Sequence, residues 1–256
     1  MKYIHDFRIV SNQRQNYEYI VLTLRAEGFE LPEMLPGQFA EVRVPNESSV
    51  YLRRPLSIHD VDYERQEIKL LIQEVGKGTK GLGSLPEGSL LNLIYPLGKP
   101  YTLPESNEVL LIGGGCGVAP LLFLGRYLKN HGIQPRYLIG ARNAEGLVRL
   151  EAYRELGEVN VTTEDGSVGT KGYVIHHPVM RTETPDFRHI YTCGPDPMMK
   201  VIAKYADRHG LSCQVSLENL MACGIGACLC CVTRTKDGNK CVCTEGPVFD
   251  SKYLQW

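Results

Sequence analysis

The strongest constraint in this 256-residue sequence is a group of cysteines near its C-terminal end. Six of the nine cysteines fall within residues 223–243, whereas Cys116, Cys193 and Cys213 stand apart. Residues 213–256 are too few to bury a core of their own, so another element has to hold them together. A reducing compartment disfavours a disulfide framework, and such a density of thiols there favours a metal. The sequence therefore predicts a metal-stapled C-terminal segment.

The spacing of the cysteines predicts which metal group they bind. Cys223, Cys228 and Cys231 form a C-x4-C-x2-C pattern, the spacing of plant-type [2Fe–2S] sites, in which a fourth cysteine follows downstream. Small residues inside the pattern, Gly224 among them, let the backbone wrap a cluster and direct N–H groups at sulfur. We therefore expect an iron–sulfur cluster in this segment.

The fourth ligand is either Cys241 or Cys243. We expect Cys243, because residues 244–249 then form a turn and an apolar anchor behind it. Cys230 and Cys241 would be non-ligands, although each lies one or two positions from a proposed ligand. The alternative is a structural zinc, for which Cys228/Cys231 and Cys241/Cys243 would form an imperfect pair of hooks.

The first hundred residues show strand-like runs separated by turn residues. Alternating apolar positions and breakers such as 35–37 predict an antiparallel β-barrel or sandwich, without a helix. The predicted strands cover residues 19–24, 38–44, 67–72 and 90–95.

From about residue 101 to 212 the pattern changes to strand, glycine turn and helix. This alternation predicts a doubly wound parallel α/β sheet. The expected strands cover residues 108–112, 136–140, 159–162 and 188–192, and the helices start near Pro120, at 147 and at 197. The domains are thus predicted as a β-barrel (1–100), an α/β dinucleotide-binding domain (101–212) and a small cluster-binding domain (213–256).

Three further patterns suggest ligand contacts. Glycines at 113, 114, 115 and 117, between a strand and a helix, would let a pyrophosphate approach the helix N-terminus. The pattern departs from G-x-G-x-x-G because position 118 is valine. Arg54 can clamp a phosphate, Ser57 can hydrogen-bond a flavin edge, and Gly78-Thr79 offers donors to a pyrophosphate. Cys193 closes a predicted strand, where ligands bind in open α/β sheets, although alone it fits an ordinary buried cysteine.

Taken together, these motifs resemble the ferredoxin–NADP reductase superfamily, in order and over residues 1 to about 210. The C-terminal cysteines with residues 245–249 (Glu-Gly-Pro-Val-Phe) look like one branch of it, the electron transfer subunits of class 1B dihydroorotate dehydrogenases. The motifs that carry the resemblance are 36–39 (Pro-Gly-Gln-Phe), 54–57 (Arg-Pro-Leu-Ser), Gly78-Thr79, 113–120 and Cys193-Gly194-Pro195.

The resemblance implies a set of cofactor contacts. FAD would be held by Arg54 on its phosphate and Ser57 on its isoalloxazine, and one [2Fe–2S] cluster by the four cysteines ending at Cys243. The remaining FAD residues would be Pro55, Leu56, Leu71, Ile72, Gln73, Gly78 and Thr79. NAD would be bound by Gly113, Gly114, Gly115, Gly117, Cys193, Gly194 and Pro195, with Cys193 beside the nicotinamide. The resemblance requires no residue to act as an acid or base.

It also implies a relay. A separate FMN-containing catalytic subunit would oxidise dihydroorotate, and electrons would pass through the cluster and FAD to NAD⁺ in pyrimidine (UMP) biosynthesis, in a heterotetramer of two subunits of each kind. One rival is a ferredoxin:NADP oxidoreductase or sulfide dehydrogenase subunit; Arg142 would suit a 2′-phosphate but does not decide. A second rival is a zinc-stapled, cofactor-free binding module.

Composition narrows the remaining classes. The formal net charge of −1 gives no electrostatic case for nucleic acid. The first residues lack the apolar core of a signal peptide and no stretch approaches about 20 apolar residues, so we expect a cytoplasmic protein with no membrane partner. We read His176-His177 as a solvated loop and Glu164-Asp165 as an ordinary turn. The tail ending in Trp256 could pack on a partner or fray.

Overall fold

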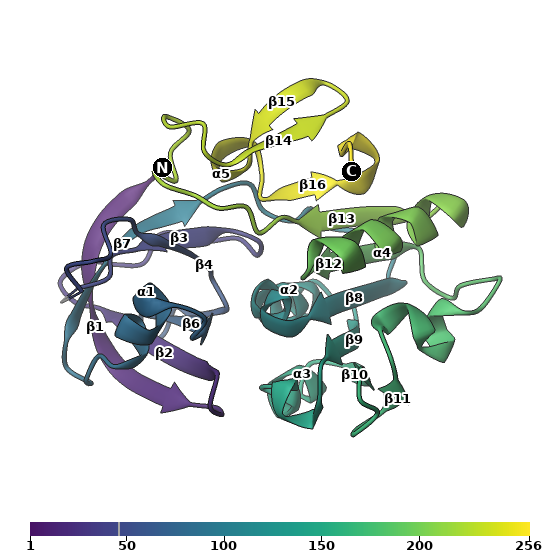
Figure 1. The fold of residues 1–256 in the computed structure, drawn as a ribbon, viewed down its shortest axis with the longest axis horizontal. Helices are drawn as coiled ribbons and strands as arrows, with labels where there is room; N and C mark the ends of the chain where they lie inside the picture. Colours follow the sequence, from purple (N-terminus) through teal and green to yellow (C-terminus); the bar gives the residue numbers. More distant parts are fainter. Residues whose placement is uncertain (46) are drawn as a thin grey trace.

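The structure is a computed structural model that describes residues 1–45 and 47–256. Its first sheet is antiparallel throughout, with the order β4-β3-β7-β1-β2-β6-β5 (Figure 1). The strands are Tyr3–Arg14 (β1), Tyr19–Ala26 (β2), Phe39–Val42 (β3), Arg54–Ser57 (β4), Asp60–Asp62 (β5), Glu67–Gln73 (β6) and Leu90–Leu97 (β7).

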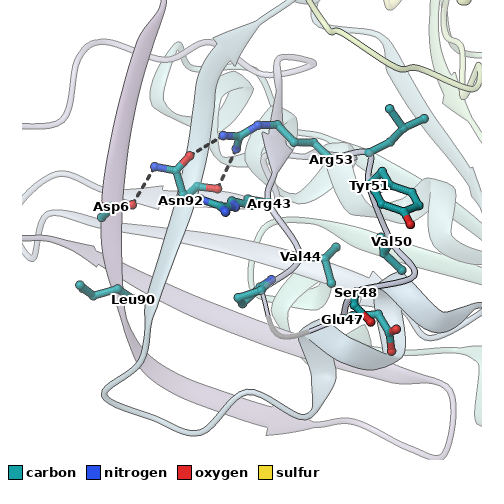
Figure 2. Close-up of a pocket in the computed structure, with 12 residues that line it drawn as sticks. Asp6, Arg43, Val44, Glu47, Ser48, Val50, Tyr51, Arg53, Leu90 and Asn92 are labelled. Carbon is teal, nitrogen blue, oxygen red and sulfur yellow. Dashed lines mark hydrogen bonds between the residues drawn. The ribbon is translucent and has the colours of Figure 1, made fainter.

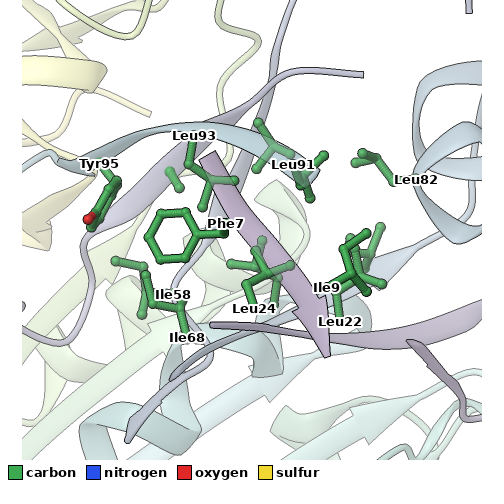
Figure 3. Packing of buried hydrophobic residues seen from close by; sticks show 14 of the residues in the cluster. Phe7, Ile9, Leu22, Leu24, Ile58, Ile68, Leu82, Leu91, Leu93 and Tyr95 are labelled. Carbon is green, nitrogen blue, oxygen red and sulfur yellow. The ribbon is translucent and has the colours of Figure 1, made fainter. Parts of the chain in front are cut away.

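Alternation along these strands builds the core of the barrel. Figure 3 shows Phe7 and Ile9 of β1 packed among side chains from β2 and β7, all of them fully or almost fully buried. Because successive side chains of a strand point to opposite faces, one face fills the barrel. Leu82 closes it from α1 (Lys77–Gly83), so the prediction of no helix here was wrong. Three glycines in seven residues hid this helix, since glycine is a poor helix former.

The second sheet is mostly parallel, with the order β11-β10-β9-β8-β12-β13-β16. Chain order reverses direction between β8 and β12, the topological switch point at which open α/β sheets bind ligands. Its strands are Val109–Gly114 (β8), Arg136–Ala141 (β9), Glu158–Thr163 (β10), Thr170–Lys171 (β11), His189–Cys193 (β12), Ser212–Ser216 (β13) and the antiparallel Val248–Asp250 (β16).

The helices of this part largely follow the sequence pattern. The first and last expected helices are observed as α2 (Ala119–Asn130) and α4 (Asp196–Arg208). The helix expected over 147–156 is only α3 (Leu150–Arg154), which Arg149 precedes in a left-handed conformation. Within the described residues, no helix is both long and apolar enough to cross a membrane.

The C-terminal segment packs on both sheets. It contains the hairpin of Val232–Thr235 (β14) and Gly238–Cys241 (β15), followed by α5 (Val242–Glu245), along one edge of the molecule in Figure 1. Strands β13 and β16, placed by sequence in the cluster-binding domain, instead extend the α/β sheet. Cys231 and Cys243 share a buried cluster with Phe39 of the barrel and Val215 of β13. The three-domain boundaries themselves stay a prediction.

Candidate functional site

The switch point of the α/β sheet is lined by glycine. Gly113 in β8 pairs with Cys193 in β12, so the two predicted nucleotide motifs meet in one register. A Cβ on Gly117 would lie 2.3 Å from the Cys193 carbonyl oxygen, and one on Gly114 would lie 2.6 Å from the Met198 sulfur. These glycines therefore let the first turn before α2 press directly against the end of β12.

A cleft of about 630 Å³ opens beside this point, between the barrel and the α/β sheet. Tyr19 and Gln73 line it from the barrel, and Gly115 and Cys116 line it from the glycine turn. Of the predicted NAD residues, Gly114, Gly115 and Pro195 line the cleft. The others, Gly113, Gly117, Cys193 and Gly194, are not among its lining residues. In the structure these four residues shape the wall of the cleft without lining it.

Glu218 is a cleft residue that the sequence analysis missed. It follows the carboxyl end of β13, and its Oε1 lies 3.6 Å from the Cys193 Sγ. Burial, together with the Glu218 charge, raises the pKa of the Cys193 thiol well above its usual value, so this cysteine is a neutral thiol rather than a nucleophile. The signal was available: a carboxylate immediately after the next parallel strand shares an edge with Cys193.

The predicted FAD strand and glycine turn meet as expected. Gly78 lies against the Arg54 side chain, since a Cβ there would be 2.5 Å from Nε. The Arg54 guanidinium donates to the Leu52 carbonyl at 2.9 Å, and in the part of the chain that the structure describes no carboxylate lies within salt-bridge distance of it. Its charge is therefore available to an anion. The Thr79 hydroxyl instead bonds the backbone of Gly76 at 3.1 Å, so it is engaged within its own turn.

The other predicted FAD residues differ in whether their side chains are buried or reach the cleft. Pro55, Leu56 and Ser57 are half-buried in β4. Leu71 and Ile72 are buried in two different apolar clusters, so only their backbone could meet a cofactor. By contrast, the Gln73 side chain reaches the cleft wall and donates to Glu18 at 3.0 Å.

A second hollow, of about 790 Å³, lies on the barrel and is shown in Figure 2. Arg53 lines it and donates to the Asn92 carbonyl at 3.1 Å, while Asn92 in turn donates to Asp6. Arg53 is thus tied to the barrel strands. Of the two adjacent arginines, Arg54 is the one presented toward the glycine turn.

The four predicted cluster cysteines form two pairs. The Cys228 thiol lowers the pKa of Cys223 and the Cys231 thiol raises that of Cys243, and the charge of Cys223 also raises the pKa of Cys243, so the two pairs are neighbours. Cys231 and Cys243 are buried, Cys228 is exposed and Cys223 is half-buried. Cys230 is exposed. In the described part of the chain, no three His, Cys, Asp or Glu side chains are close enough together to hold a single metal ion.

Backbone N–H groups converge on the sulfur atoms. The Ile225 N–H donates to Cys223 Sγ at 3.5 Å, and the Cys243 N–H donates to Cys231 Sγ at 3.4 Å. The donor from Ile225, with those of Cys228, lowers the pKa of Cys223 to about 6, whereas burial raises that of Cys243. A loop whose amides stabilise thiolates suits an iron–sulfur cluster.

Cys241 has a different position from Cys243. It immediately precedes α5, its backbone N–H donates to Glu245 Oε2 at 3.0 Å, and its side chain is half-buried. Burial and the neighbouring Cys231 thiol raise the pKa of the Cys241 thiol, as they do for Cys243, so the pKa shifts do not separate the two residues. The position of Cys243, which is fully buried and whose backbone N–H donates to Cys231 Sγ, fits a cluster ligand better.

Glu41 was also missed by the sequence analysis. It lies on β3, is fully buried, and neither carboxyl oxygen has a hydrogen-bond partner in the part of the chain that the structure describes. Burial raises its pKa to about 7. Nothing in the sequence around Glu41 distinguishes it from a strand residue facing solvent, because its neighbours come from segments far along the chain.

The structure also shows the surroundings of the residues to which the sequence assigned no definite role. His176 and His177 each accept a backbone N–H of their own turns. Glu164 and Arg142 line the cleft, whereas Asp165 caps the turn at Ser167. The tail is packed rather than frayed: the Lys200 Nζ lies 5.8 Å from the Trp256 ring centroid, and the Gln255 N–H donates to Arg234.

Comparison with known proteins decides the family. A family model described as the iron–sulfur cluster binding domain of dihydroorotate dehydrogenase B matches residues 218–255, and one described as an oxidoreductase NAD-binding domain matches 111–204. The dihydroorotate dehydrogenase B (NAD⁺) electron transfer subunit of Shouchella clausii is 37% identical over 92% of this chain and 91% of its own. That of Caldanaerobacter subterraneus subsp. tengcongensis is 37% identical over 97% of each. The chain belongs to the family of dihydroorotate dehydrogenase B electron transfer subunits.

A solved structure agrees with this family in fold. A protein described as an NADH-dependent reduced ferredoxin–NADP oxidoreductase superposes with a TM-score of 0.84 at 28% identity, over 98% of this chain and 90% of that one. The predicted resemblance, fold class and oxidoreductase function are confirmed. At the level of the family, so are FAD, a [2Fe–2S] cluster and NAD as cofactors. The ligand residues stay predictions.

Proposed function

We propose that this chain receives electrons from the FMN of a dihydroorotate-oxidising partner and passes them through one [2Fe–2S] cluster and FAD to NAD⁺, in pyrimidine (UMP) biosynthesis in the cytoplasm. FAD exchanges a hydride with nicotinamide and single electrons with a cluster, which is the chemistry such a chain requires. The observation that carries the proposal is that the barrel contributes residues both to the nucleotide cleft and to the buried core that holds the cysteine loop.

The residues of the barrel are assigned to FAD. Arg54 would hold a phosphate, supported by its contact with Gly78 and by the unpaired guanidinium described above. Ser57 would meet the isoalloxazine, and Gln73 would reach it from the cleft wall. For Leu71 we assign only a backbone contact, as for Ile72, since both side chains are buried.

The residues at the switch point are assigned to NAD. Gly114 and Gly115 would bring backbone amides to the pyrophosphate, and Cys193 with Glu218 would border the nicotinamide. Gly117→Ala tests this assignment because its Cβ would meet the Cys193 carbonyl oxygen at 2.3 Å, so the backbone has to move. We expect NADH to reduce the bound flavin more than tenfold more slowly, with the FAD content unchanged. Unchanged reduction kinetics would remove Gly117 from the site.

Cys223, Cys228, Cys231 and Cys243 are assigned as the cluster ligands. Cys228→Ser should remove the cluster while FAD stays bound, because Cys228 is exposed and does not belong to the barrel core. Cys230→Ser is the matched control: it is also exposed and only two residues away, and iron should remain. A Cys228→Ser protein with full iron content would refute the ligand set.

The partner surface is assigned to the cysteine loop. Leu220, Ile225 and Leu229 belong to the same segment as the exposed Cys228 and Cys230, and their side chains are 85%, 49% and 64% exposed. Apolar side chains left in water around a redox site fit a protein interface. We propose that an FMN-containing catalytic subunit covers them, in a heterotetramer of two subunits of each kind. Leu229→Asp should dissociate the complex in size-exclusion chromatography and leave NADH oxidation with an artificial acceptor unchanged.

The first test is an anaerobic visible spectrum before and after NADH. Flavin bands on a broad iron–sulfur background, bleached by NADH, would support the relay, whereas a colourless zinc protein would refute it.

The second candidate function is that of a ferredoxin:NADP oxidoreductase, which the fold match at 28% identity favours. The electron transfer subunits at 37% identity favour the first candidate more strongly. Cys228→Ser tests the relay itself: if the assembled complex carrying this variant still transferred electrons from dihydroorotate to NAD⁺, the relay proposal would fail.

A further inference from the structure

A buried carboxyl group lies in the wall between the barrel and the cysteine loop. Glu41 is fully buried on β3, and both of its carboxyl oxygens lack a hydrogen-bond partner among the described residues. Buried carboxyl groups are normally paired or hydrogen-bonded, since burial without a partner is costly. Packing alone does not explain why a carboxyl group is kept buried and without a partner where the barrel meets the cysteine loop.

On one side Glu41 contacts the backbone of the cysteine loop. A Cβ on Gly224 would lie 2.5 Å from the Glu41 Cγ and 3.0 Å from its Oε1. Gly224 directly follows Cys223 and has a φ of +66°, a conformation that favours glycine. The loop thus approaches this carboxyl as closely as its backbone permits, at the residue next to a proposed iron ligand.

Through its backbone, Glu41 also belongs to the pair of strands, β3 and β4, that carries residues proposed to bind FAD. It is paired with Pro55 of β4, next to Arg54, and its backbone carbonyl accepts an N–H from Arg53 at 3.2 Å. The carboxyl therefore stands between the strand assigned to FAD and the loop assigned to the cluster. Electrostatic interactions are stronger in such a water-poor interior than in solvent, because the local dielectric constant is low.

We propose that Glu41 is a positioning residue that tunes the reduction potential of the cluster through its contact with Gly224. Reduction would add one electron, and therefore one negative charge, to a cluster held by this loop. A carboxylate held beside the loop opposes that change and lowers the potential, in the way that outer groups tune metal sites. The inference rests on the proposed function, because it requires a cluster in this loop.

The test is an EPR-monitored redox titration of the full chain at pH 9, comparing wild type with Glu41→Gln and Glu41→Leu. Both substitutions remove the charge at similar size, so both should shift the midpoint potential of the cluster to more positive values, with iron and FAD per chain unchanged. Glu67→Gln is the control: Glu67 is also buried in the barrel but is paired with Arg25 on β2.

The outcomes are distinct. No shift in Glu41→Gln, or an equal shift in the Glu67→Gln control, overturns the proposal. A shift in Glu41→Leu alone also overturns it, since that indicates packing rather than charge. If Glu41→Leu fails to fold, Glu41→Gln alone supplies the measurement, and Glu41→Asp, which keeps the charge, should have a midpoint potential closer to that of wild type than to that of Glu41→Gln. A wild-type protein with no iron–sulfur EPR signal after reduction would instead contradict the proposed function itself.

Discussion

The packing of His59 predicts an acid-sensitive joint between the two sheets. His59 follows β4, is fully buried, and its Nδ1–H donates to the Ala119 carbonyl at the start of α2 at 2.7 Å. Its Nε2 has no partner among the described residues. Burial lowers the pKa of His59 from 6.5 to about 4, because a proton on Nε2 would create an unpaired buried charge. Asp60 opposes this shift, whereas Lys69 and Arg149 add to it.

The sign and size of the effect follow from linkage. Between pH 6.5 and 4 the unfolded state binds a proton that the folded state excludes, so the free energy of unfolding falls as the pH falls. The full contribution is present above pH 6.5 and is lost by about pH 4. A difference of about 2.5 pKa units corresponds to about 3 kcal/mol, of which about 2 kcal/mol is lost by pH 5.

The assay is denaturant unfolding of wild type and His59→Gln at pH 7.5 and pH 5. Glutamine can still donate to Ala119 but does not titrate, so the variant should lose about 2 kcal/mol less than wild type over this interval. His131→Gln, at an exposed histidine after α2, controls for the loss of a histidine. If wild type and His59→Gln lose the same stability, the buried-histidine argument is wrong.

Two further predictions concern the cofactor sites. Gly78→Ala should weaken FAD binding about 10- to 100-fold, because its Cβ displaces the Arg54 guanidinium. Gly76→Ala, whose Cβ meets nothing within 4 Å, should bind FAD normally in a fluorescence titration. Cys243→Ser should lose its iron whereas Cys241→Ser should keep it, measured as iron per chain. The reverse result would exchange the two ligand assignments.

The parts of the site that sequence predicted are those written in one continuous segment. The cysteine spacing from 223 to 231 and the glycine turn at 113–117 each specify a local backbone path, so their chemistry can be predicted without knowing the fold. The alternation of strands and helices then brings the end of β12 beside the end of β8. The pattern thereby predicted that Cys193 lies at the switch point, and the structure adds its register with Gly113.

The parts that sequence missed depend on contacts between distant segments. Glu41 gains its environment from Gly224, and His59 from Ala119, contacts that span the barrel, the α/β sheet and the cysteine loop. The motifs also did not predict the direction in which individual side chains point. The Thr79 hydroxyl is used within its own turn, and Leu71 points into a core, so the resemblance names segments but does not give the direction of their side chains.

The environment of the cysteines explains how a segment too small to fold alone can carry a redox site. Cys231 and Cys243 belong to a core shared with the barrel and the α/β sheet, whereas Cys228 is exposed beside Leu229. One thiol pair is therefore anchored by packing and the other faces outward, toward the surface proposed for the partner. Loss of the outer pair should cost the cluster with little structural change, but loss of the buried pair should also loosen the contact between the two sheets. Comparing the denaturant midpoints of Cys228→Ser and Cys243→Ser tests this asymmetry: equal midpoints would show that the buried pair contributes no more to the fold than the exposed one.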